Sequence, residues 1–147
     1  MKIIDTNILN KFAKGEILLD LSEEFYLTED LRNEIDNLGS ISSEYDTKIK
    51  SMKFSNIEDY HYFNEAIYLE NYKKFINKHN KIVSFYGLKG LADISILACI
   101  EMMVKPTNPT LFDTNRSIEV STHDSNLKDA LKEEFDGKIT INDPIKQ

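Results

Sequence analysis

The sequence predicts an α/β fold built around a small, mostly parallel sheet flanked by helices. Three observations predict it. Short apolar, strand-like segments alternate with helical ones along the chain, residues 91–104 are apolar on almost every side, and 147 residues suit one domain. Hydrophobic residues make up 41% of the chain and charged residues 29%, which is typical of a globular protein. We therefore expect a single domain over residues 1–147.

The expected strands are short and apolar. Residues 2–5 and 24–27 are short apolar runs, and residues 117–121 alternate Ile118 and Val120 with polar neighbours. Residues 82–86 fit a strand or a loop equally well. The segments expected to form strands are residues 2–5, 24–27, 117–121 and 138–141.

The expected helices follow from apolar residues at spacings of three and four. Thr28 is a good N-cap for one helix, and Asp124 or Ser125 for the last one. Residues 43–79 have a helical pattern throughout, with a long helix that Ser55 or Asn56 caps. The other helices are expected at residues 8–14, 29–39, 91–104 and 125–135.

Charge and composition exclude some classes of function. The net charge of −7 argues against a protein that binds nucleic acid mainly through a basic surface. It is compatible with an acidic site that holds divalent cations against phosphate. Cys99 is the only cysteine, the first residues lack a long apolar segment, and residues 94–104 are too short to span a bilayer. We expect a cytoplasmic protein with no membrane partner.

Four acidic residues stand where a parallel sheet binds its ligands. Asp5 and Asp124 each follow an expected strand, and ligands of such sheets lie beyond the carboxyl ends of the strands. Glu34 lies one turn into a helix, and Asp93 begins the most apolar helix. Each also has an ordinary interpretation: a turn for Asp5, a solvated helix residue for Glu34, and a favourable helix start for Asp93 and Asp124. Only the four together indicate a site.

The context of these acids resembles the PIN domain, the nuclease fold shared by toxins of VapC-type toxin–antitoxin systems and by several RNA-processing enzymes. Residues 1–9, with Asp5-Thr6-Asn7, resemble its first strand and turn. Residues 90–98 resemble the helix with its third acid, and residues 120–124 its fourth strand and Thr-x-Asp ending. Residues 27–35 are similar to its second strand and glutamate helix. Residues 40–88 match nothing in particular.

This resemblance implies a three-layer sandwich in which the four acids meet at the carboxyl edge of the sheet. It implies one or two Mg²⁺ or Mn²⁺ ions and hydrolysis of RNA phosphodiester bonds. Asp5 and Asp93 are the leading direct ligands, Asp124 binds directly or through water, and Glu34 binds a second metal or orients the attacking water. By the same resemblance, Asn7 and Thr122 position the metal or the water.

The chemistry suits these residue types. Carboxylates are preferred ligands of hard cations such as Mg²⁺, which retains several waters. Carboxylates held together repel each other, and a cation removes that repulsion. The bound cation also neutralises phosphate charge and lowers the pKa of a bound water. No histidine or cysteine nucleophile is required, and the histidines and Cys99 lack the spacing of a zinc site.

Two other features have a functional and an ordinary interpretation. An aromatic stripe from Tyr60 to Phe75 fits a core face, or a face for a homodimer or another protein partner. A basic cluster fits an RNA-backbone contact, or a solvated helix end whose cations favour the negative terminus. The lysines of this cluster are Lys73, Lys74, Lys78 and Lys81.

Several functions stay open at this point. The ribonuclease is either a growth-inhibiting toxin with an antitoxin partner or an RNA-processing enzyme. A non-catalytic PIN-like module that binds RNA or protein is a second class, although such a module has no reason to retain mutually repelling carboxylates. A phosphatase is disfavoured, because the Asp5-Thr6-Asn7 turn lacks the second aspartate of the Asp-x-Asp phosphatases.

Overall fold

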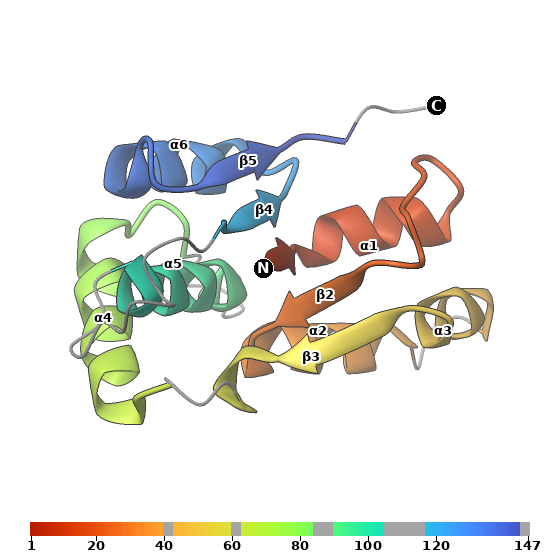
Figure 1. Cartoon of the computed structure of the whole chain (residues 1–147), viewed down its shortest axis with the longest axis horizontal. Helices are drawn as coiled ribbons and strands as arrows, with labels where there is room; N and C mark the ends of the chain where they lie inside the picture. The colour runs from red at the N-terminus through yellow and green to blue at the C-terminus, as the bar shows by residue number, and fades with distance from the viewer. Residues whose placement is uncertain (40–42, 60–62, 84–89, 105–116, 145–147) are drawn as a thin grey trace.

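Five short strands form one parallel sheet in the order β3-β2-β1-β4-β5 (Figure 1). The computed structural model describes residues 1–39, 43–59, 63–83, 90–104 and 117–144. In this strand order, β1 lies at the centre of the sheet, and β3 and β5 lie at its edges. The strands are β1 (Lys2–Ile4), β2 (Glu24–Leu27), β3 (Lys53–Asn56), β4 (Glu119–Ser121) and β5 (Thr140–Asn142).

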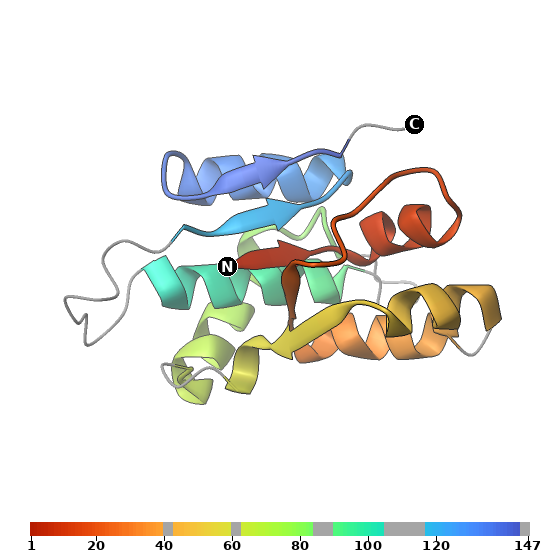
Figure 2. The ribbon, with the colours of Figure 1, turned by 45° about the vertical axis from the view of Figure 1, so that its right-hand side comes forward.

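The central strand joins the two ends of the chain. Ile3 pairs with Tyr26 of β2 on one side and with Val120 of β4 on the other. Figure 2 shows β1, β4 and β5 side by side. Beyond the last paired residues, the backbone N–H of Asp5 still donates to the carbonyl of Ser121, 3.0 Å away. This bond fixes the chain where β1 ends.

Helices flank the sheet, an arrangement compatible with a three-layer sandwich. The helices are α1 (Thr6–Ala13), α2 (Glu29–Gly39), α3 (Ser43–Lys50), α4 (Glu65–Lys78), α5 (Leu91–Val104) and α6 (Ser125–Phe135), with a 3₁₀ turn, η1 (Ile57–Asp59). The α5 helix is the buried one that the sequence predicts: Ala92 and every residue from 94 to 102 are buried. The α4 helix packs along it. No helix in the described parts of the chain is long and apolar enough to cross a membrane.

The prediction of helix throughout residues 43–79 is wrong in its middle. Residues 53–56 form the edge strand β3, which pairs with β2 from Glu24↔Lys53 to Leu27↔Asn56. The η1 turn follows, and α4 begins only at Glu65, where the side chain of Asn64 accepts a hydrogen bond from the N–H of Ile67. Phe54 is the only apolar residue of β3, so the strand depends on its partner rather than on its own pattern.

The other elements agree closely with the sequence. Thr28 caps α2, because its hydroxyl accepts from the N–H of Leu31 at 3.2 Å. The first helix begins two residues earlier than predicted, at Thr6, and the last strand lies slightly later than predicted. Phe75 of the aromatic stripe is fully buried, whereas Phe63, Ile67 and Tyr72 are only partly buried. Tyr60 and residues 84–86 lie outside the described residues.

Gly90 fixes the start of α5, and replacing it with alanine is expected to destabilise the protein. Its φ is +91°, and an added Cβ would overlap the carbonyl oxygen of Ile82. We expect Gly90→Ala to cost about 3 kcal/mol or more of unfolding free energy, measured by urea denaturation. Gly15→Ala is the matched control, because Gly15 has φ +77° but open space around it, and should cost only about 1–2 kcal/mol. Equal losses would contradict the overlap.

Candidate active site

Asp5 lies buried where the central strand ends. The residue is 5% exposed, and its Oδ2 accepts a hydrogen bond from the hydroxyl of Thr122 at 2.8 Å. The pKa of Asp5 is raised to about 6, and burial is the largest cause. Hydrogen bonds from Thr122 and the Thr6 backbone lower the pKa, and the charges of Glu34 and Asp124 raise it. Asp5 is the N-cap residue of α1, but its side chain makes no capping hydrogen bond to that helix.

Asp93 lies in the first turn of α5, and the charges of the other three acids also affect its pKa. Burial is the largest cause of its raised pKa, which reaches about 8. The charges of the three other acids raise the pKa further, with Asp5 contributing the most of the three. The four acids of the sequence prediction therefore lie close enough in space to repel one another.

Glu34 is held in this cluster by a residue that the sequence analysis did not assign to the site. The hydroxyl of Thr6, the first residue of α1, donates to Oε2 of Glu34 on α2 at 2.5 Å. Thr6 is itself buried. The only available signal was its position beside Asp5, because the contact joins residues 28 positions apart.

Asp124 has a structural role as well as a place among the acids. Its Oδ1 accepts from the N–H of Leu127 at 2.9 Å, so it caps α6 as the ordinary interpretation predicted. Its own N–H donates to the hydroxyl of Thr122 at 3.0 Å. Because that hydroxyl also donates to Asp5, Thr122 joins Asp5 and Asp124 through one buried side chain.

Asn7 contacts the backbone beside the acids rather than a carboxylate. Its Oδ1 accepts from the N–H of His123 at 3.5 Å, a long contact between α1 and the turn after β4. The imidazole of His123 is also engaged within the protein. Its Nδ1 lies 2.5 Å from the ammonium of Lys11, and its Nε2 lies 2.6 Å from the carbonyl of Pro144. These contacts hold the turn that carries Asp124 against α1.

Two of the four predicted RNA-contacting lysines, Lys74 and Lys78, pair with acids far along their helices from the candidate site. Lys74 pairs with Glu101 near the end of α5 at 3.1 Å, and Lys78 pairs with Glu134 near the end of α6 at 2.5 Å. Each partner lies eight or more residues along its helix from Asp93 or Asp124, which corresponds to roughly 12 Å or more. Lys73 and Lys81 are exposed.

The acids fit a hard divalent cation in donor chemistry but not as a ready-made cage. They offer only oxygen ligands, and none of them forms an ion pair with a basic side chain in the described residues. Within those residues, no three acidic, histidine or cysteine side chains are placed to hold one metal ion together. Mg²⁺ usually binds proteins through one or two carboxylates and completes its coordination with water.

The described residues form an all-parallel α/β fold in which Asp5 and Asp124 follow the central strands, and Glu34 and Asp93 lie on the helices α2 and α5. Comparison with known proteins adds no assignment: no family model, curated protein or solved structure matches the chain.

Proposed function

We propose that this protein is a divalent-metal-dependent ribonuclease of the PIN-domain kind, which hydrolyses RNA phosphodiester bonds with Mg²⁺ or Mn²⁺. The observation that carries the proposal is the raised pKa of Asp93 and Asp5, caused first by burial and then by the charges of neighbouring acids. Acids whose pKa is strongly raised by burial and by like charges cluster at functional sites. A cation is the simplest partner for them.

The position of each residue suggests its role in the proposed reaction. Asp93 and Asp5 are the most buried of the acids and would hold the cation directly. When bound, the cation would neutralise phosphate charge and lower the pKa of a bound water. Thr122 fixes the Asp5 carboxylate through its hydrogen bond.

The remaining acids act around that pair. Thr6 fixes Glu34, which is partly exposed and so could orient the attacking water. Asp124 uses Oδ1 to cap α6 and would contact the cation directly or through water. The proposal covers a growth-inhibiting toxin with an antitoxin partner and an RNA-processing enzyme alike, because both would use this site in the cytoplasm.

The direct test is cleavage of total cellular RNA with Mg²⁺, with Mn²⁺ and with a chelator. The parent protein should cleave with either metal and not with the chelator. The Asp93→Asn variant should cleave on the order of a thousandfold more slowly than the parent. Cleavage that persists in the chelator would contradict a metal-dependent mechanism.

A cation should stabilise the fold through Asp5. Without metal, Asp5→Asn should raise the melting temperature, because it removes one charge from the repelling group. Mg²⁺ at ten times its Kd should stabilise the parent by about 1.4 kcal/mol, or roughly 3–6 °C, and the variant by less. Differential scanning fluorimetry measures both shifts. Equal responses of the two proteins to Mg²⁺ would count against a shared cation.

The exposed lysines of α4 and its C-terminal end offer a test of RNA binding. If Lys73 and Lys81 contact the backbone of single-stranded RNA, the double change to glutamine should weaken binding. The slope of log K against log salt should fall by roughly 1.4. The double variant of Lys128 and Lys132 on α6 is the control. An unchanged slope in the Lys73 and Lys81 variant would remove these residues from the RNA interface.

A further inference from the structure

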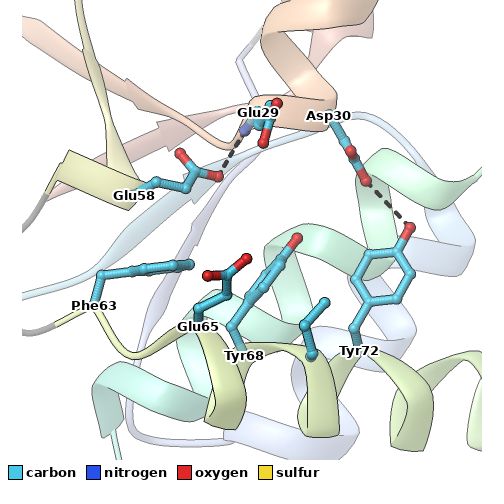
Figure 3. A pocket seen from close by; sticks show the side chains of 8 residues that line it. Glu29, Asp30, Glu58, Phe63, Glu65, Tyr68 and Tyr72 are labelled. Atoms are coloured by element: carbon cyan, nitrogen blue, oxygen red, sulfur yellow. Dashed lines mark hydrogen bonds between the residues drawn. The ribbon is translucent and has the colours of Figure 1, made fainter.

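A pocket of about 270 Å³ opens between the start of α2, the η1 turn and the first half of α4 (Figure 3). None of the residues that line it belongs to the group of Asp5, Glu34, Asp93 and Asp124. Its lining combines acidic side chains with aromatic rings, and no basic side chain takes part. The pocket is therefore a separate feature that the proposed nuclease does not explain.

Four carboxylates surround this pocket from three different elements. Glu29 and Asp30 come from α2, Glu58 from η1 and Glu65 from α4. Two of them have neutral partners: Oε1 of Glu58 accepts from the N–H of Glu29 at 2.7 Å, and Asp30 accepts from the hydroxyl of Tyr72 at 3.1 Å. In the part of the chain that the structure describes, none of the four pairs with a lysine, arginine or histidine.

Three aromatic rings follow one another along the α4 side of the pocket. The rings of Phe63 and Tyr68 lie 5.3 Å apart, and those of Tyr68 and Tyr72 lie 5.8 Å apart. Figure 3 shows the Tyr68 ring beside Glu65, with its hydroxyl directed toward α2. Burial raises the pKa of Tyr68, so the hydroxyl stays protonated. Unlike Tyr72, it makes no hydrogen bond within the described residues, which leaves it available to a ligand.

The geometry points to an organic cation, and we propose that this pocket binds a guanidinium group. A guanidinium is planar, stacks on aromatic faces and donates five hydrogen bonds that reach separated carboxylates. A phosphate is excluded by like charge. The volume suits a single side chain or a small molecule rather than a larger cofactor.

The test is a titration of the full-length protein with agmatine, a small guanidinium compound, followed by calorimetry and amide NMR. We expect a Kd on the order of 1 mM, with shifts concentrated in residues 65–72. Neither the neutral compound N-butylurea nor butylamine, which carries only the ammonium group of agmatine, should bind. Glu65→Gln and Tyr68→Leu should each weaken agmatine binding by about tenfold, since one removes a charge and the other an aromatic face.

Glu70→Gln is the matched control, because Glu70 is also exposed on α4 but does not line the pocket. Circular dichroism checks that each variant folds. An end-capped Gly-Arg-Gly peptide distinguishes the two sources of the group: clearly tighter binding than agmatine indicates an arginine of a protein partner, and equal binding indicates a small molecule. Absence of agmatine binding, or binding that Glu65→Gln and Tyr68→Leu leave unchanged, would overturn the proposal. No readout uses RNA cleavage, so this result is independent of the nuclease.

Discussion

Asp93→Asn is expected to lower metal-dependent RNA cleavage on the order of a thousandfold while leaving the protein folded. The amide has the shape of the carboxyl group but carries no negative charge, so it binds Mg²⁺ poorly. The charges of all three other acids also act on Asp93. A cation bound to Asp93 would therefore offset the repulsion within the whole group of acids. The measurement is the initial rate of cleavage of a labelled RNA at saturating Mg²⁺, with the melting temperature recorded in parallel.

The control for this variant is Asp129→Asn, which removes an equal charge from the exposed side of α6. It should leave the cleavage rate unchanged, because Asp129 is not one of the coupled acids. Full activity of the Asp93 variant would refute the assignment. An equal loss in both variants would indicate that net charge, rather than a cation site, controls the activity.

The second large effect is on stability as pH changes. The pKa of Asp93 is about 8 in the folded protein and close to 3.8 when the chain unfolds. Between these values the folded state retains a proton that the unfolded state releases. The unfolding free energy therefore falls as pH rises, by at most ~1.4 kcal/mol per pH unit for this one proton. The stabilisation is complete below pH 4 and lost as pH rises through 8.

Asparagine at position 93 does not titrate, so the variant should gain stability relative to the parent from pH 5 to pH 8. Urea denaturation in a chelator at these two pH values measures the difference. Mg²⁺ should narrow it, because a cation compensates the ionised parent. Asp129→Asn should show no such trend. A constant difference between the Asp93 variant and the parent would mean that Asp93 titrates as an ordinary surface acid.

The sequence predicts much of the fold because most elements have their own apolar pattern. The α5 helix is apolar on all sides, and its predicted bounds, 91–104, agree with the structure. The β3 strand has one apolar residue, Phe54, and exists because β2 offers a paired edge. Such pairing is a property of the folded sheet, so no local pattern could reveal it.

The sequence likewise predicts one part of the candidate site and does not predict another. Asp5 and Asp124 follow predicted strands, so the topology of a parallel sheet was enough to bring them together. The contact of Thr6 with Glu34 depends on how α1 and α2 pack, which the sequence does not show. The sequence predicts a core face or a partner face for the aromatic stripe. Phe75 of this stripe lies in the core, and Tyr72 packs against the core and also lines the pocket.

The pairing of β1 with β4 has a consequence during synthesis. Lys2 is paired with Glu119, and the N-terminal amine donates to the carbonyl of Ser117 at 2.7 Å. Asp5 thus meets Thr122 and Asp124 only after residues 117–124 have left the ribosome. A nascent chain that ends before residue 117 lacks these partners, so it also lacks the complete site of the proposed ribonuclease.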